Sequence, residues 1–152
     1  MKHKVPLFIY GTLQDFDVMK LVTQRETLSQ SDFTDASLNH FCLEEVKDEN
    51  YPLLVKRDHH IVMGKIFIVE SEQELNRLKY FEDEQEYTLT EHIVETKSGK
   101  KECLLFFPTS NIESSQKSWS YNKWSQVTNK VAFLERVKNY MSQFNTESHP
   151  KW

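Results

Sequence analysis

Long apolar runs, clustered basic residues and cysteines are all scarce in this 152-residue chain. No apolar run approaches the ~20 residues that a membrane-spanning helix needs, so we expect no membrane partner. The 19 basic residues are outnumbered by 23 acidic ones, which gives a net charge of −4 and no basic face for nucleic acid. Residues 1–4 lack a signal-peptide cleavage pattern, and we therefore expect a cytoplasmic protein.

The few cysteines and histidines exclude several kinds of site. Cys42 and Cys103 are the only cysteines, and both lie in apolar, strand-like runs that favour reduced core thiols over a disulfide framework. The six histidines show no metal-ligand spacing, and no P-loop, dinucleotide fingerprint or Gly-x-Ser-x-Gly elbow occurs. We therefore expect neither a metal nor a cofactor.

The length and the hydrophobic pattern predict one α+β domain over residues 1–144, followed by a tail at 145–152 that we expect to be flexible. Apolar and alternating runs predict strands, and steps of three or four predict helices. Because several strands are apolar on both faces, we expect a small mixed, mostly antiparallel β-barrel flanked by helices. Expected strands are 5–10, 38–46, 51–55, 61–69, 87–96 and 103–107; expected helices are 17–25, one from Ser71, and 127–144; 57–60 is an expected turn.

Glycine is also rare, with three residues in the whole chain, and one of them ends the first predicted strand. Tyr10, Gly11, Thr12 and Leu13 lead from that strand toward a helix. Such a segment can direct several backbone N–H groups into one concavity, where they bind an anion or an oxyanion. The alternative is an ordinary strand-to-helix turn.

The helix that begins at Ser71 carries a second candidate, Glu82. Ser71 and Glu74 have the spacing of a capping box, and Leu75 and Leu78 define a buried face. If the helix reaches Glu82, its carboxylate lies on the side of the leucines, where burial and neighbouring acids raise a carboxyl pKa and suit it to proton transfer. The alternative is a helix that frays at Tyr80 and leaves residues 82–86 as a solvated acidic loop.

Four short motifs in order resemble the γ-glutamylcyclotransferase family, in the branch of γ-glutamylamine cyclotransferase and the AIG2-like proteins. They are Tyr10-Gly11-Thr12-Leu13, Tyr51-Pro52-Leu53-Leu54-Val55, Gly64-Lys65-Ile66-Phe67, and Leu78-x-x-Phe81-Glu82 followed by Tyr87. The family fold, a small mixed barrel flanked by helices, agrees with the barrel expected above. Lys79, Asp83 and Leu89 stand where members commonly have Asp, Gly and Arg.

The resemblance implies an enzyme that cyclises a γ-glutamyl amine or γ-glutamyl peptide to 5-oxoproline and releases the free amine. It implies Glu82 as the general acid/base and Tyr10, Gly11, Thr12, Leu13 and Tyr87 as substrate-binding residues. The expected partner is a small γ-glutamyl substrate, and the expected oligomeric state is a monomer. Two alternatives stay open: a non-catalytic barrel that binds a small ligand or a protein, and an enzyme that removes a γ-glutamyl group from a larger biosynthetic molecule.

Overall fold

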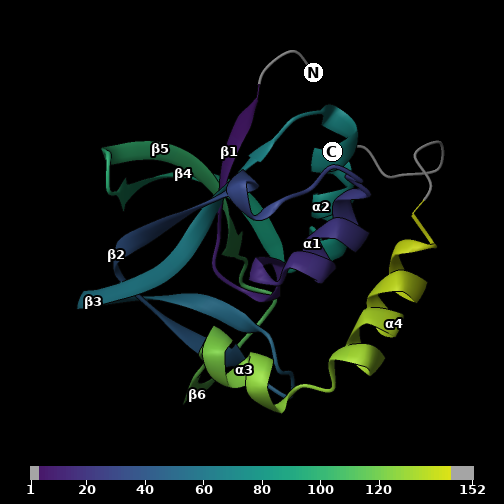
Figure 1. The fold of residues 1–152 in the computed structure, drawn as a ribbon. Helices are drawn as coiled ribbons and strands as arrows, with labels where there is room; N and C mark the ends of the chain where they lie inside the picture. Colours follow the sequence, from purple (N-terminus) through teal and green to yellow (C-terminus); the bar gives the residue numbers. More distant parts are fainter. Residues whose placement is uncertain (1–3, 145–152) are drawn as a thin grey trace.

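The computed structural model describes residues 4–144, so the predicted tail at 145–152 lies outside the described residues (Figure 1). Two short 3-10 helices, η1 and η2, accompany the strands and α-helices. In chain order the elements are β1 (Val5–Ile9), η1 (Thr12–Gln14), α1 (Phe16–Thr23), η2 (Gln30–Asp32), β2 (Phe33–Val46), β3 (Pro52–Val69), α2 (Glu72–Glu82), β4 (Tyr87–Thr96), β5 (Gly99–Pro108), β6 (Ser114–Ser118), α3 (Tyr121–Val127) and α4 (Lys130–Met141).

Five strands close into a barrel in the order β3-β1-β5-β4-β2, and β2 completes the ring by pairing with β3. Only the β1–β5 pair is parallel among these described strands, while β6 adds to the outside of the ring along β2. The predicted mixed, mostly antiparallel barrel with flanking helices is therefore confirmed. Helices α1, α2 and α4 gather on one side of the barrel (Figure 1).

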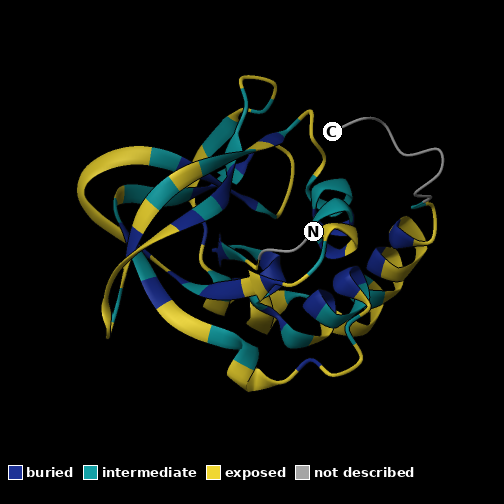
Figure 2. Ribbon diagram, turned by 90° about the horizontal axis from the view of Figure 1, so that it is seen from above, coloured by how far each residue is buried: buried dark blue, intermediate teal, exposed yellow. Residues whose placement is uncertain are grey.

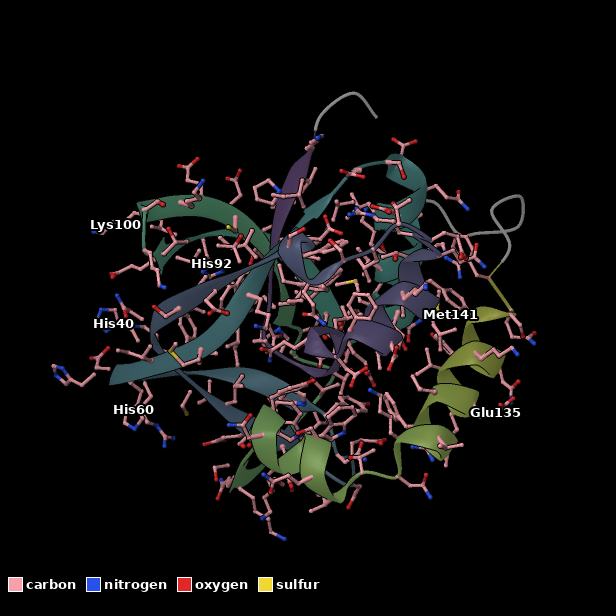
Figure 3. All side chains as sticks on the ribbon, viewed as in Figure 1. His40, His60, His92, Lys100, Glu135 and Met141 are labelled. Carbon is pink, nitrogen blue, oxygen red and sulfur yellow. The ribbon has the colours of Figure 1, made fainter. Side chains whose placement is uncertain are left out.

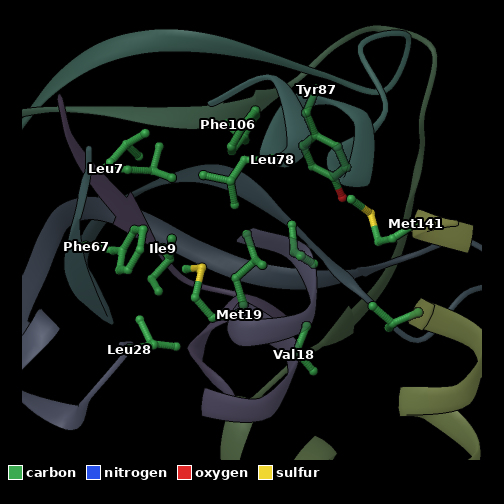
Figure 4. Close-up of a cluster of buried hydrophobic side chains, with 14 residues drawn as sticks. Leu7, Ile9, Val18, Met19, Leu28, Phe67, Leu78, Tyr87, Phe106 and Met141 are labelled. Atoms are coloured by element: carbon green, nitrogen blue, oxygen red, sulfur yellow. The ribbon is translucent and has the colours of Figure 1, made fainter. Parts of the chain in front are cut away.

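The strand β1 is apolar on both of its faces because each face packs into a different core. Leu7 and Ile9 pack into a cluster with the helices, whereas Phe8 and Tyr10 pack into a second cluster formed by the strands. Alternate side chains of one strand point to opposite faces, so β1 separates the two cores. Figure 4 shows the first cluster, which joins the strands to α1, α2 and α4.

The strand β3 is longer than the sequence predicts. The expected turn at residues 57–60 does not end the strand, because β3 continues from Pro52 to Val69; residues 57–60 form an unpaired bulge between Lys56, which pairs with Phe41, and Ile61, which pairs with Asn39. His40 and His59 adopt positive φ values of 72° and 68°, and the register shifts between Asn39 and Phe41. This β-bulge accommodates the residues that favour a turn, and the ladder with β2 continues on both sides of it. Figure 2 shows the exposed residues of this hairpin, which include 56–61.

Gly64 lies where β3 crosses β1 at close range. A Cβ built on Gly64 would lie 2.4 Å from the carbonyl oxygen of Ile9 and 2.7 Å from the Phe8 ring. No side chain fits there without movement of the backbone. A glycine at position 64 therefore allows β3 and β1 to approach closely.

The C-terminal helix also differs from the prediction of one helix over 127–144. Within that range the structure has α4, which runs from Lys130 to Met141 and is capped by Asn129, while a separate short helix, α3, capped by Ser120, precedes it and ends at Val127. The strand β6 was not predicted, because its sequence Ser-Ser-Gln-Lys-Ser contains no apolar residue. Within residues 4–144, no helix is long and apolar enough to cross a membrane.

Candidate active site

Glu82 is the last residue of α2. The helix begins after Ser71, whose hydroxyl accepts the N–H of Glu74 at 3.1 Å, and it ends where Asp83 takes a positive φ of 71°. The predicted cap at Ser71 is confirmed, although the Glu74 carboxylate accepts the N–H of Glu70 in place of that of Ser71. The alternative of a helix that frays at Tyr80 is wrong.

The carboxyl group of Glu82 is desolvated, although the residue as a whole is only partly buried. Burial, and secondarily the negative charge of Glu86, raises the pKa of Glu82 to about 8. Among residues 4–144, no side chain or backbone group forms a hydrogen bond or an ion pair with this carboxylate. Glu82 therefore can exchange a proton near neutral pH, and its oxygens are available to a ligand.

A cavity of about 330 Å³ adjoins Glu82. Its walls come from the end of β1, η1, the β2–β3 loop, the end of α2, β4, β5 and α4, so it lies where the barrel meets the helices. The residues that line it are Phe8, Ile9, Tyr10, Gly11, Thr12, Leu13, Asn50, Tyr51, Pro52, Phe81, Glu82, Asp83, Glu86, Tyr87, Phe106, Phe133, Arg136, Val137 and Tyr140. The structure thus brings together all six residues that the sequence singled out.

The segment from Gly11 to Leu13 lines this cavity and contains backbone N–H groups without a partner in the described chain. Gly11 precedes η1, and Thr12 and Leu13 are buried. Their N–H groups donate no hydrogen bond within the described chain, since the first donors of a helical turn have no partner in the turn itself. Gly11 has a negative φ of −115°, so its lack of a side chain matters for space: a Cβ would lie 3.3 Å from Cγ of Pro52.

Two buried tyrosines complete the wall near Glu82. The Tyr10 hydroxyl donates to the carbonyl oxygen of Phe106, and the Tyr87 hydroxyl donates to that of Pro52 at 2.7 Å. Burial, together with the charge of Glu82, raises the pKa of both phenols. Their protons are already donated to the backbone, so toward a ligand each hydroxyl oxygen offers acceptor lone pairs.

Two further acidic side chains, Asp83 and Glu86, line the cavity. Glu86 accepts a hydrogen bond from the Tyr51 hydroxyl at 3.1 Å, and burial is the largest cause of its raised pKa. Asp83 is exposed, and its carboxylate accepts the N–H of Gln85 at 3.0 Å. The cavity is therefore rich in negative charge close to Glu82.

Sequence reasoning missed the wall that α4 contributes, as well as Tyr51. The lining positions Phe133, Arg136, Val137 and Tyr140 recur at intervals of three and four, so they share one face of α4. Such spacing predicts that a helix has an inner face but does not say what that face meets.

The described histidines do not contribute to the cavity. His40, His60 and His92 lie on the barrel strands, at a distance from α4 and its Glu135 in the same view (Figure 3). No group of three or more His, Cys, Asp or Glu side chains within residues 4–144 is arranged to hold a metal ion.

Comparisons with known proteins place these features in context. The family model described as gamma-glutamyl cyclotransferase, AIG2-like, matches residues 7–126. AIG2-like protein D and AIG2-like protein A of Arabidopsis thaliana are 24% and 25% identical to this chain, over 91% and 89% of it and over 90% and 80% of their own lengths.

Solved structures share the fold. A solution structure of an Arabidopsis thaliana protein has a TM-score of 0.64 at 21% identity, over 99% of this chain and 97% of that one. A protein described as gamma-glutamyl cyclotransferase has a TM-score of 0.62 at 18% identity, over 90% and 87%. An AIG2-like protein of Mus musculus has a TM-score of 0.53 at 21% identity, over 79% and 96%.

Proposed function

The chain belongs to the gamma-glutamyl cyclotransferase, AIG2-like family, and from this premise and the geometry of the cavity we propose that it is a γ-glutamylcyclotransferase. Its substrate is a γ-glutamyl amine or γ-glutamyl peptide. Its products are 5-oxoproline and the free amine or amino acid.

The reaction is an intramolecular aminolysis. The α-amine of the γ-glutamyl group attacks the γ-carbonyl carbon, a new C–N bond closes the five-membered ring, and the original amide C–N bond breaks. The nucleophile belongs to the substrate, so the protein needs to hold a folded conformer in which amine and carbonyl meet. This chemistry explains why the sequence contains no nucleophile motif, and it requires no metal or cofactor.

The observation that carries the proposal is an unpartnered Glu82 carboxyl group, with a pKa raised to about 8, on the wall of a 330 Å³ cavity. As a carboxylate, Glu82 takes a proton from the substrate ammonium and frees the amine. As a carboxylic acid, it returns a proton to the departing nitrogen. A pKa near the working pH suits one group to both steps.

The N–H groups of Gly11, Thr12 and Leu13 supply the electrostatic part of the mechanism. These three residues line the same cavity as Glu82, and their N–H groups have no acceptor within the described residues. In the proposed complex they bind the α-carboxylate of the γ-glutamyl group or the oxyanion that develops on its γ-carbonyl. Tyr10 and Tyr87, whose hydroxyl oxygens can accept, orient the substrate ammonium.

The proposal extends to the setting of the enzyme. Cys42 and Cys103 are free thiols, which supports a cytoplasmic location. We propose a monomer that acts on a small molecule, with the cavity as its only contact to the substrate.

A panel of γ-glutamyl amines and γ-glutamyl peptides, with 5-oxoproline release as the measured product, tests the proposal. We expect release from at least one member of the panel by the wild-type protein, and none by the Glu82→Gln variant. Release that requires the γ-glutamyl group on a larger biosynthetic molecule would identify the second kind of enzyme that the sequence leaves open. Binding of γ-glutamyl compounds without any release would contradict the proposal and identify a binding barrel.

A further inference from the structure

One wall of the cavity comes from a helix beyond the residues that the family model matches. The match ends at residue 126, whereas α4 begins at Lys130. One face of α4 lines the cavity, and Glu135 projects from its outer side (Figure 3). The face consists of Phe133, Arg136, Val137 and Tyr140.

This wall is fixed at both ends of α4. The Lys130 ammonium lies 3.1 Å from the Asp15 carboxylate and 2.8 Å from that of Asp17, at the start of α1. At the other end, the Tyr140 hydroxyl donates to the Tyr80 carbonyl oxygen at 2.8 Å, and the two rings stack with centroids 4.7 Å apart. The α4 helix is therefore held at a defined position beside α1 and α2.

Arg136 is the only basic residue among those that line the cavity. Its guanidinium lies 5.5 Å from the centroid of the Phe133 ring, and within residues 4–144 it forms no ion pair and no hydrogen bond. Stacking on an aromatic face leaves the in-plane N–H donors of a guanidinium free. A planar fork of unused donors matches a carboxylate in both shape and charge.

None of the three acids that line the cavity, Glu82, Asp83 and Glu86, forms an ion pair with Arg136 in the described part of the chain. Glu86 accepts from Tyr51, and Asp83 accepts from the backbone of Gln85. Arg136 is exposed, so its guanidinium is solvated; it lies beside the Phe133 ring and has no acceptor from the described part of the chain.

We propose that Arg136 binds a carboxylate on the group that the enzyme releases. The inference rests on the proposed function, in which the γ-glutamyl end of the substrate lies between Glu82 and the donors of Gly11 to Leu13. The carboxylate that reaches Arg136 then belongs to the leaving part, and the ring of Phe133 packs against its apolar portion. The substrate class is accordingly γ-glutamyl amino acids and peptides, in preference to γ-glutamyl derivatives of simple amines.

A matched pair of substrates tests this directly. γ-Glutamyl-alanine and γ-glutamyl-ethylamide differ only by the carboxylate of the released group. For Arg136→Gln we expect kcat/KM on γ-glutamyl-alanine to fall about tenfold or more, mostly through KM, as for loss of a charged hydrogen bond. On γ-glutamyl-ethylamide the same variant changes kcat/KM by less than about twofold.

Two further variants separate a binding role from a structural one. Arg136→Lys keeps the charge and recovers part of the loss on γ-glutamyl-alanine. Lys138→Gln removes a charge from the same helix at an exposed position outside the cavity, and we expect it to behave as wild type on both substrates. Equal losses on both substrates in Arg136→Gln, or no loss on either, overturn the inference.

Failure of the proposed function gives a different pattern. If the wild-type protein releases 5-oxoproline from neither compound, calorimetric binding of the same pair decides the role of Arg136. Tighter binding of γ-glutamyl-alanine that disappears in Arg136→Gln supports the carboxylate site even though the activity is absent. Equal binding of the two compounds, or no binding of either, overturns it.

Discussion

Each end of α2 carries a glutamate whose carboxyl group is withdrawn from solvent, but the surroundings of the two carboxyl groups are opposite in kind. At the N-terminal end, Glu74 accepts two hydrogen bonds from the Arg25 guanidinium, at 2.8 and 2.7 Å, and a third from the N–H of Glu70 at 3.0 Å. The side chains of Arg25 and Glu74 are only 8% and 11% exposed. This carboxylate is fully engaged in joining α2 to the segment after α1.

At the C-terminal end, Glu82 has no such donors among the described residues. Burial without a counter-charge raises its pKa to about 8, with a further contribution from Glu86. The same residue type on the same helix therefore carries two roles. A buried carboxylate that accepts hydrogen bonds from another segment joins the two segments. A desolvated carboxylate without hydrogen-bond donors has a raised pKa and can exchange a proton near neutral pH.

The largest expected difference between the two ends is in activity. We expect Glu82→Gln to lower kcat by roughly 10²–10⁴, because the amide keeps the shape of the side chain and cannot carry the proton. Circular dichroism and a thermal melt establish that the variant is folded, and 5-oxoproline release measures its turnover. A folded variant with wild-type turnover would remove Glu82 from the mechanism.

At the other end we expect a loss of stability. Glu74→Gln leaves the buried Arg25 guanidinium with a neutral hydrogen bond to the Ile68 carbonyl oxygen and with the carboxylates of Asp32 and Glu70 at 3.9 and 3.7 Å, so the free energy of unfolding falls by about 3 kcal/mol. Urea denaturation measures the change. The turnover of the folded variant stays close to that of wild type, and a loss of turnover comparable to that of Glu82→Gln would show that the two ends are not independent.

The sequence predicts the position of Glu82 because the signals are local. The cap at Ser71 sets the start of the helix, and Leu75 and Leu78 set its buried side, so the side on which Glu82 lies follows from helical period alone. The lack of partners around Glu82 does not follow, because it depends on β1, β4 and α4, which are far away in the sequence.

Other parts of the fold could not be predicted for the same reason. The residues 57–60 carry a turn signal, yet they stay within one long strand as an unpaired bulge, because β3 pairs with β2 on both sides of them, at Lys56 and at Ile61. The cavity face of α4 has a visible period, but only the packing of α4 against α1 and α2 turns that face toward Glu82. The polar strand β6 has no sequence signal at all.

The raised pKa of Glu82 also makes the stability of the folded protein depend on pH. The unfolded chain ionises Glu82 near pH 4.3, whereas the folded protein keeps it protonated until about pH 8, so ionisation favours the unfolded state as pH rises. Relative to Glu82→Gln, the wild type therefore loses stability between these two values and loses no more above pH 8. We expect the variant to melt at a higher temperature than wild type at pH 9, with a difference that grows as pH rises from about 4 to about 8.

Melts across pH 4–9 check this expectation. The two proteins should melt together at pH 4, where Glu82 is protonated in both the folded and the unfolded state. A difference between wild type and variant that is constant over the whole range would indicate an ordinary packing effect of the amide, and would argue against an ionisation of Glu82 near pH 8.

The smallest expected effect is on the position of that ionisation. The negative charge of Glu86 is the second cause of the raised pKa of Glu82, after burial, so removal of this charge lowers the pKa and the rising limb of kcat/KM against pH moves down. For Glu86→Gln we expect a shift of roughly half a pH unit, as for one partly solvated neighbouring charge.

Asp83→Asn is the matched control, because it removes an adjacent exposed charge that does not contribute to the pKa of Glu82. The substrate amine titrates identically in all three proteins, so a difference between the limbs belongs to the enzyme. A limb that moves equally in both variants would mean that the general acidity of the opening, and not Glu86, tunes Glu82.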